Sequence, residues 1–186
     1  MTDSYLIIAR SSRFKVQAFA TGRLSVFGHS PSIAIREFTG EVQFDPDAPE
    51  KSTLKAKADL ASLELMDDIK ERDAVELMRT MHSDVLQSDQ FPEVAYECSR
   101  PATGFSKTGE GLYSLTLNGD MTLHGVTRPQ PIPATASLSG DTLRCNGDFP
   151  LLQTDFGIQL IKVAGGMLTL KDELKFSFGF LCRKQG

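Results

Sequence analysis

The clearest pattern in the chain is an alternation of apolar and polar residues from Leu115 to Leu123. The odd positions are apolar or small, and the even positions are polar. A period of two residues is typical of a strand buried on one face. His124 and Gly125 supply a turn, and the alternation then resumes at Ile132, Ala134, Ala136 and Leu138. This stretch therefore predicts one long β-hairpin with one apolar side.

Three prolines constrain the second arm of this hairpin. Pro129, Pro131 and Pro133 occupy alternate positions, so in an extended strand they all lack an N–H donor along the same edge. Proline in a sheet belongs at edges, strand starts or bulges. We therefore expect this segment to lie at a seam or rim of the sheet, where one edge is not fully paired.

The same alternation marks further strands. We expect them at Arg13 to Ala20, Leu24 to Phe27, Ile33 to Phe44, Leu54 to Leu60, Val94 to Cys98, Leu143 to Phe149 and Leu168 to Cys182. A glycine-containing loop is expected from Thr103 to Gly111, and a turn at 171–173 within the last segment. Many strands, tight turns and a single helix predict an all-β fold, an antiparallel sheet closed into a barrel of about eight strands.

One helix is predicted between Asp67 and Ser88. Asp68 and Glu71 have the spacing of a capping box at its start. Apolar residues follow at helical spacing, namely Ala74, Leu77, Met78 and Met81. This stripe is expected to pack against the barrel, and His82 near the helix end is given no catalytic role.

Length and composition indicate one domain that spans residues 1–186. The hydrophobic content of 40% and the charged content of 24% are ordinary for a globular protein, and the net charge of -4 favours neither nucleic acid nor an anionic membrane. No apolar run approaches the roughly 20 residues of a membrane span, so stable membrane insertion is not expected. The start, Met1 to Arg10, lacks the features of an export signal. A cytoplasmic location is expected.

The barrel interior has two interpretations. Large residues point inward at Phe14, Phe44, Phe176 and Phe178. Small residues share these faces at Ala18, Ala20, Gly40, Ala56, Ala58, Gly119, Ala134, Ala136 and Gly147. Barrels of about eight strands either fill with side chains or hold one small ligand. So many small residues favour a hollow interior, and the alternative is that they permit close packing.

The motifs of catalytic and metal sites are missing from the sequence. Asp155-Phe156-Gly157 occurs without the other kinase motifs, and no Gly-x-Ser-x-Gly elbow is present. The three histidines and three cysteines have no metal-ligand spacing, and the cysteines are expected to be buried free thiols. We therefore expect no enzyme activity, no catalytic residues, no cofactor and no metal.

Several motifs together resemble the YceI-like family over about Phe14 to Phe180. They are Phe38-Thr39-Gly40-Glu41-Val42-Gln43-Phe44-Asp45-Pro46, Glu71-Arg72-Asp73, Phe91-Pro92, Gly119-Asp120-Met121-Thr122-Leu123-His124-Gly125-Val126-Thr127-Arg128-Pro129 and Thr154-Asp155-Phe156-Gly157-Ile158, in this order. The resemblance implies a lipocalin-like antiparallel barrel that binds polyisoprenoids or related long-chain amphiphiles.

The leading hypothesis is therefore a non-catalytic protein that binds or transports an isoprenoid or fatty-chain lipid. Its lumen would hold the tail, and a rim around His29, Ser30 and Arg36 would bind the head group. The alternatives are a lipid-modifying enzyme using the same cavity and a solid-core interaction module, for instance a homodimer built on the proline-rich edge. The residues expected to bind the ligand are Phe14, Val16, Phe27, His29, Ile33, Phe38, Val42, Phe44, Tyr96, Leu117, Met121, Ala134, Phe156, Ile158, Phe176 and Phe178.

Overall fold

The strands form a curved wall whose inward side chains are mostly apolar. The computed structural model describes residues 2–21, 30–160, 162–163 and 168–186. In chain order the elements are β1 (Asp3–Ile7), η1 (Ala9–Ser11), β2 (Arg13–Thr21), β3 (Ser32–Ile35), β4 (Phe38–Phe44), η2 (Pro49–Lys51), β5 (Thr53–Asp59), η3 (Leu60–Ser62), β6 (Leu63–Leu65), α1 (Glu71–Thr80), η4 (Met81–Val85), β7 (Glu93–Gly109), β8 (Leu112–Leu123), β9 (Val126–Ser139), β10 (Thr142–Leu152), η5 (Gln153–Phe156), β11 (Lys162–Val163) and β12 (Leu168–Lys184).

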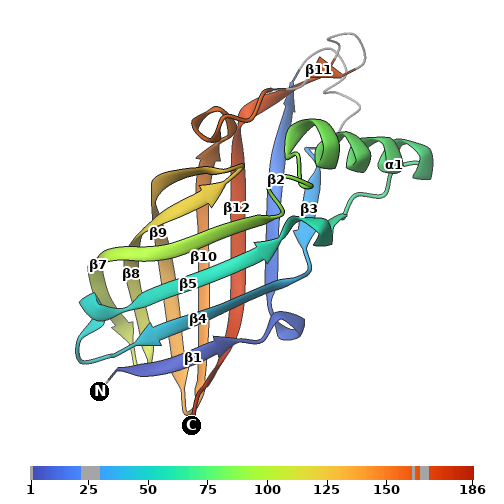
Figure 1. The fold of residues 1–186 in the computed structure, drawn as a ribbon. Helices are drawn as coiled ribbons and strands as arrows, with labels where there is room; N and C mark the ends of the chain where they lie inside the picture. Colours follow the sequence, from blue (N-terminus) through green and yellow to red (C-terminus); the bar gives the residue numbers. More distant parts are fainter. Residues whose placement is uncertain (1, 22–29, 161, 164–167) are drawn as a thin grey trace.

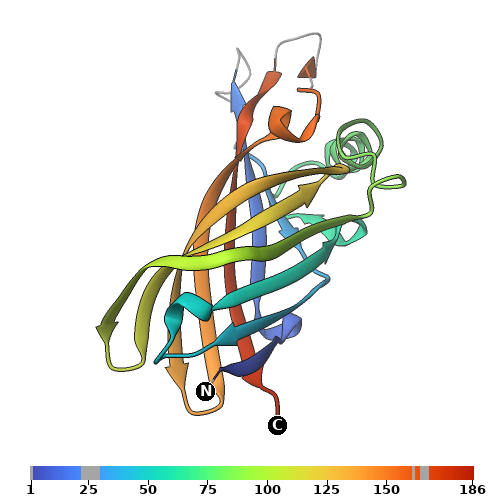
Figure 2. The same cartoon turned by 60° about the vertical axis from the view of Figure 1, so that its left-hand side comes forward.

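Eight of these strands close into an antiparallel barrel. Their order is β1-β4-β5-β7-β8-β9-β10-β12, and β12 returns to β1. Figure 1 shows β1, β4, β5 and β7 crossing in front of β10 and β12, and Figure 2 shows the same wall turned by 60°. The predicted all-β, lipocalin-like barrel of about eight strands is confirmed.

The last strand, β12, is shared between the barrel and a side extension. Its final residues pair with β1, whereas residues Thr169–Gly179 pair with β2, which continues through β3 to β6. At the corner between β1 and β2, Ser12 Oγ donates to the carbonyl of Ile8 at 2.8 Å and accepts the N–H of Leu181 at 2.9 Å. The hydroxyl group of Ser12 thus bonds to one backbone carbonyl and one backbone N–H at the point where β12 changes its partner from β2 to β1. The sequence pattern does not predict β1.

The strand predicted from Ile33 to Phe44 is wrong as a single element, because the chain turns at Arg36 and Glu37. The N–H groups of these two residues both donate to Ser62 Oγ, at 3.2 and 2.9 Å. β3 then pairs with β2 and β6, while β4 pairs with β1 and β5. The corner therefore moves the chain from the extension into the barrel.

The loop predicted from Thr103 to Gly111 is also wrong, because β7 continues to Gly109. Its second half pairs with β8 through several register shifts. Most of its side chains are exposed, with Ala102 as a buried exception. The hydrogen bonds between β7 and β8 continue beyond the hydrophobic core here. A strand that is exposed on both faces needs no alternation of apolar and polar residues, so the sequence pattern did not reveal it.

The turn expected at 171–173 is a bulge within a continuous β12. Pairing with β2 shifts register between Leu170 and Leu174. The bulged residues bind the segment before them: Asp172 accepts the N–H of Thr154 at 2.9 Å, and the carbonyl of Lys171 accepts the side-chain amide of Gln153 at 2.9 Å. A bulge commonly redirects a strand in this way.

The helix begins later than predicted, at Glu71, and Asp68 does not cap it. Lys70 occupies the N-cap without a side-chain hydrogen bond, and the carboxylate of Asp67 instead accepts the N–H of Ser32 at 2.7 Å. The expected apolar stripe packs only partly. Met78 and Met81 pack against the core, whereas Ala74 and Leu77 are half-buried and do not belong to the packed hydrophobic cluster. The helix lies to one side of the barrel, beyond β3, and points away from it (Figure 1).

Candidate ligand-binding site

The barrel interior contains two small apolar cavities. The larger has a volume of about 40 Å³ and is lined by Phe14, Phe38, Leu54, Ala56, Lys57, Ala58, Val94, Ala95, Tyr96, Met121, Ile132, Phe149, Phe178 and Phe180. The smaller has a volume of about 30 Å³ and is lined by Val42, Phe44, Ser52, Thr53, Leu54, Leu115, Leu117, Ala134, Thr135, Ala136, Cys145 and Phe178. Leu54 and Phe178 line both cavities, so these two side chains stand at the boundary between them.

The predicted site residues fall into four groups. The cavities bring together Phe14, Phe38, Val42, Phe44, Tyr96, Leu117, Met121, Ala134 and Phe178. Other predicted residues are buried but line neither cavity, namely Ile33, Phe156, Ile158 and Phe176. Val16 is partly buried and packs against the core. Phe27 and His29 lie outside the described residues.

Several lining residues are missing from the predicted site. They include Leu54, Ala56, Ala58, Val94, Ile132, Phe149 and Phe180. Their alternation already places them on inward faces, so the signal that would have found them is the strand period itself.

Of the residues expected to form a rim for the head group, Arg36 donates a hydrogen bond to Glu64 at 2.6 Å, in an ion pair whose side chains are both 58% exposed.

Aromatic rings form a cluster inside the barrel. Phe14 lies 5.8 Å from both Phe38 and Phe180, measured between ring centroids, and Phe178 stacks on Phe180 at 4.7 Å. Offset or edge-to-face rings at these distances stabilise a core beyond their buried area alone. The rings therefore form a packed cluster rather than the walls of an open channel.

The expected hollow interior is largely filled, and two glycines explain why. A Cβ atom built on Gly119 would come within 2.7 Å of the Tyr96 ring and hydroxyl. A Cβ atom on Gly147 would come within 2.6 Å of the Phe178 ring. The small residues at these positions thus make room for large neighbouring side chains, which is the close-packing alternative. The two cavities are open space that remains among the described residues.

A seam lies in the barrel wall between β9 and β10. Pairing between these strands extends from Ser139 only to Ala134, opposite Gly147. The strands β8 and β9 are joined by a two-residue turn, and the backbone N–H groups of alternate residues on β9 face β8 and β10 in turn. By this alternation, the backbone nitrogens of Pro129, Pro131 and Pro133 face β10. These prolines have no hydrogen to donate, so the ladder ends where they begin. The predicted seam is confirmed.

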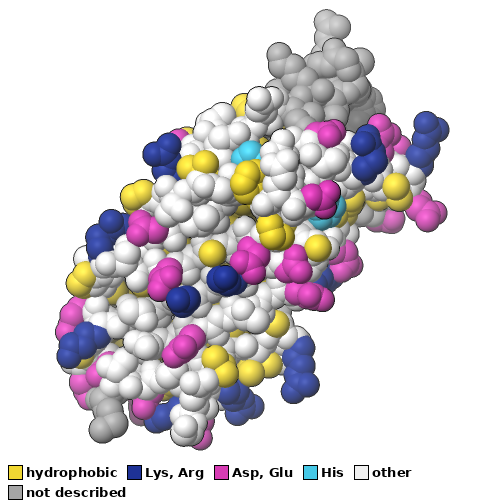
Figure 3. Space-filling view, in the orientation of Figure 1, with side chains coloured by type: hydrophobic (Ala, Val, Ile, Leu, Met, Phe, Trp, Pro, Cys, Tyr) yellow, Lys and Arg dark blue, Asp and Glu magenta, His cyan; other side chains and the backbone are white. Residues whose placement is uncertain are grey.

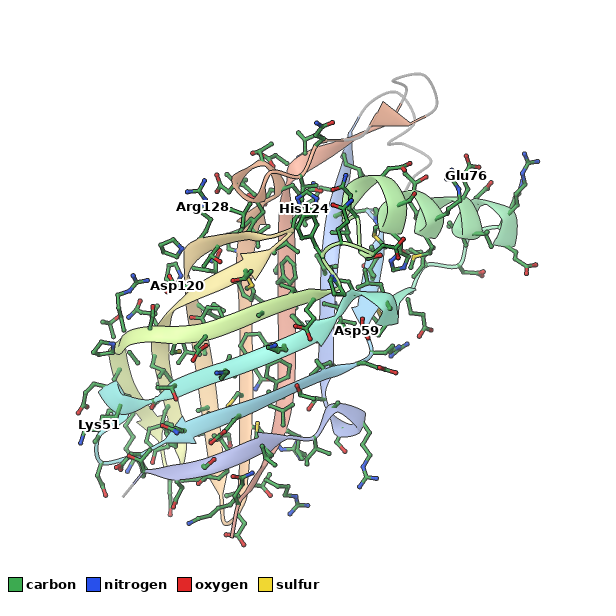
Figure 4. The ribbon with its side chains drawn as sticks, in the orientation of Figure 1. Lys51, Asp59, Glu76, Asp120, His124 and Arg128 are labelled. Carbon is green, nitrogen blue, oxygen red and sulfur yellow. The ribbon has the colours of Figure 1, made fainter. Side chains whose placement is uncertain are left out.

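The segment η5 lies at the upper end of this seam, and His124 holds it. In the turn between β8 and β9, His124 has a positive φ of 51°. Its Nδ1 lies 3.3 Å from the carbonyl oxygen of Phe156, and its Nε2 lies 3.2 Å from Oε1 of Gln87. Arg128 adds a bond from Nε to the carbonyl of Asp155 at 3.1 Å. Figure 4 shows His124 and Arg128 together near this end of the barrel.

Two buried hydroxyl groups stand out in the apolar interior. Tyr96 is 5% exposed and lines the larger cavity, and Ser52 is 3% exposed and lines the smaller one. Neither hydroxyl oxygen has a hydrogen-bond partner among the described residues. Each cavity is therefore lined by one residue with such a buried hydroxyl group.

The three cysteines are free thiols. Burial raises the pKa of Cys98, whose sulfur also accepts the N–H of Leu54 at 3.2 Å. A hydrogen bond with Cys182, followed by burial, raises the pKa of Cys145. The thiols of Cys98 and Cys145 therefore stay protonated near neutral pH and are poor nucleophiles. Within the described ranges, no cluster of His, Cys, Asp or Glu could hold a metal ion.

The outer surface carries both signs of charge. Figure 3 shows Lys and Arg side chains interspersed with Asp and Glu across the visible face. This mixture agrees with the net charge of -4 and offers nucleic acid no basic face in that view. Among the residues that the structure describes, no helix is both long and apolar enough to span a membrane.

Comparison with known proteins gives consistent matches. The model of the YceI-like domain matches residues 8–180. A UPF0312 protein of Pseudomonas putida (strain W619) is 30% identical over 149 residues, which are 76% of this chain and 71% of the relative. A UPF0312 protein of Azotobacter vinelandii is also 30% identical, with the same coverage.

Two solved structures share the fold at low sequence identity. BcnA of Burkholderia cenocepacia aligns with a TM-score of 0.70 at 17% identity, covering 94% of this chain and 98% of that one. A polyisoprenoid binding domain from Saccharophagus degradans, implicated in plant cell wall breakdown, aligns with a TM-score of 0.67 at 9% identity, covering 97% and 98%. At these identities the likeness concerns the barrel fold.

Proposed function

Because the chain belongs to the YceI-like family, we propose that it binds an isoprenoid or another long-chain amphiphilic lipid inside its barrel. The observation that carries the proposal is the pair of cavities, which are lined mostly by apolar side chains and lie within the antiparallel barrel. The polyisoprenoid binding domain with the same fold supports this ligand class. Carriage of the lipid between membranes or enzymes is part of the proposal.

Binding a long chain requires the lumen to expand. Cavities of about 40 and 30 Å³ are far smaller than the roughly 300 to 1,000 Å³ of typical small-molecule sites. Phe178 stands between the two cavities, so displacement of its ring would join them. The seam favours this change, because β9 and β10 can separate further beside Pro129 to Pro133 without breaking ladder hydrogen bonds.

Affinity then depends on apolar burial. Each buried methylene contributes about 0.8 kcal/mol, and the cost of moving the aromatic cluster offsets part of that gain. Longer chains bury more methylenes for the same rearrangement. We therefore expect affinity to rise with chain length until the lumen is full.

The proposal is tested with lipid-stripped protein and polyprenols of increasing length, with native mass spectrometry for stoichiometry and a displacement assay for affinity. A blocking variant, Ala134→Met, fills the smaller cavity from β9, and Lys15→Met places the same side chain on an exposed position of β2. We expect Ala134→Met to weaken a long polyprenol more than a short one, and Lys15→Met to change neither.

Other outcomes favour the alternative functions. A protein that binds no polyprenol or fatty alcohol of any length would be a solid-core interaction module. A chemically altered lipid recovered after incubation would identify a lipid-modifying enzyme.

A further inference from the structure

The hydroxyl group of Tyr96 is a buried donor without a partner. Tyr96 lies on β7, is 5% exposed and lines the larger cavity. Its hydroxyl oxygen makes no hydrogen bond of normal geometry to any described residue, and the nearby Cys98 thiol is only a weak acceptor. Leaving such a group without a good partner destabilises a fold, so each case in a folded protein calls for an explanation.

The neighbouring strand positions this hydroxyl. Cys98, two residues after Tyr96, pairs with Gly119 on β8. The absence of a side chain at Gly119 leaves the space that the end of the phenol occupies, since a Cβ there would approach both Cζ and the hydroxyl oxygen to 2.7 Å. A residue as small as alanine would push the phenol away. Packing therefore holds the hydroxyl in place, beside the thiol of Cys98.

The phenol keeps its proton near neutral pH. Burial, and then the nearby Cys98, raise the pKa of Tyr96. The other side chains around the cavity are mainly aliphatic or aromatic. Lys57 is the exception, and its ammonium group pairs with Glu93 at 3.1 Å where both side chains are more than half exposed.

We propose that Tyr96 is a specificity residue that donates a hydrogen bond to an uncharged acceptor oxygen, such as a carbonyl or ether, carried by the lipid into the larger cavity. This inference rests on the proposed lipid-binding function. It favours a neutral oxygen over a carboxylate or phosphate, because a buried anion needs a cation or several donors. The amphiphile would thus enter with an uncharged polar group buried and its remaining chain along the aromatic cluster.

Three probes of equal chain length test the inference: a methyl ketone, the corresponding alkane and the corresponding carboxylate. Their affinities are measured by displacement of a pyrene-labelled alkane. The variants are Tyr96→Phe and, as a matched control, Tyr113→Phe, because Tyr113 is equally buried on β8 and lines neither cavity.

For the unmodified protein we expect the ketone to bind more tightly than the alkane and the carboxylate. Tyr96→Phe should weaken ketone binding about three- to tenfold, the effect of one net hydrogen bond, and leave alkane binding unchanged or tighter. Tyr113→Phe should leave the preference for the ketone intact. With a carbon-13-labelled carbonyl, the infrared stretching band should shift to lower frequency on binding, and Tyr96→Phe should abolish that shift.

The lipid-free protein provides an independent readout. Because Tyr96→Phe deletes an unsatisfied hydroxyl, its melting temperature should stay the same or rise. A clear fall would mean that the hydroxyl already has a partner in the lipid-free protein, and would overturn the inference.

The failures of the two proposals are distinguishable. If the alkane binds but Tyr96→Phe affects ketone and alkane equally, or affects neither, the Tyr96 inference is overturned while lipid binding stands. If no probe binds to the unmodified protein, lipid binding and the Tyr96 inference are both overturned.

Discussion

The phenol ring of Tyr96 lies against the bare backbone of Gly119, on the strand next to it. A Cβ atom at position 119 would come within 2.7 Å of the Tyr96 hydroxyl oxygen and 2.5 Å of the carbonyl oxygen of Glu97. Real Cβ atoms do not approach other atoms this closely, so a side chain at position 119 requires movement of the ring and of the strand. This contact fills the space that the inward alternation of small residues leaves in the lumen.

We predict that Gly119→Ala destabilises the protein by about 1–3 kcal/mol, the usual cost of overpacking. Urea unfolding measures the change. In a Tyr96→Leu background the ring is gone, so the same substitution should cost less, and the two changes should be coupled. Strictly additive costs would show that Tyr96 does not limit the space at position 119.

The seam predicts different effects on stability for two substitutions on β9. Pro131→Thr adds an N–H that faces the unpaired side, so it should change stability by no more than about 0.5 kcal/mol. Thr135→Pro instead removes a donor where Thr135 pairs with Asn146, and should cost about 1–3 kcal/mol. Urea unfolding compares them, and the new amide in Pro131→Thr should exchange rapidly with solvent. Slow exchange there would mean that the seam is closed.

The contacts of His124 predict a local effect on η5. Both His124→Asn and His124→Ala remove the imidazole, but Asn tolerates a positive φ better and should preserve the turn. In His124→Asn the amides of Gly157 and Ile158, which bond to carbonyls within η5, should exchange faster while the strands stay protected. Hydrogen exchange measures this difference. Unchanged exchange at η5 would show that the imidazole does not hold the segment.

The histidines are not expected to determine lipid affinity. His29, His82 and His124 should each tolerate replacement by Gln without loss of binding, because apolar burial dominates the affinity. The displacement assay with a long polyprenol tests each variant. A loss of more than about 3 kcal/mol with the fold intact would exceed a typical neutral hydrogen bond and identify a buried polar contact to the lipid.

The raised pKa values predict a loss of stability at alkaline pH. The pKa values of Cys98, Cys145 and Tyr96 are all higher in the folded protein than in the unfolded chain. Above about pH 8.5 the unfolded thiols lose protons that the folded state retains. The folded state then binds more protons, so its stability is fully present below that pH and falls as the pH rises.

Urea unfolding between neutral pH and pH 10 or so measures this slope. Cys98→Ala removes one of the titrating groups and should reduce the slope, even if it lowers stability at neutral pH. An identical slope in Cys98→Ala would contradict the role of that thiol.

The sequence by itself determined which face of each strand is buried. Alternation has a period of two residues and is local, so the inward rows of β8, β9 and β10 can be read without knowing their partners. The seam could also be predicted from local sequence, because a proline has no N–H donor whichever strand lies beside it. Nine of the predicted site residues line the cavities, since each belongs to such a row.

Only the tertiary structure decided how these rows meet. The short strand β1 closes the barrel through long-range pairing with β4 and β12, which its own few residues do not reveal. The ends of β7 and α1 depend on partners such as β8 and the Ser32–Asp67 bond. Whether small inward residues enclose a void depends on which ring faces them, and for Gly119 and Gly147 those rings come from neighbouring strands. Packing volume is a property of facing side chains, so strand periodicity alone could not supply it.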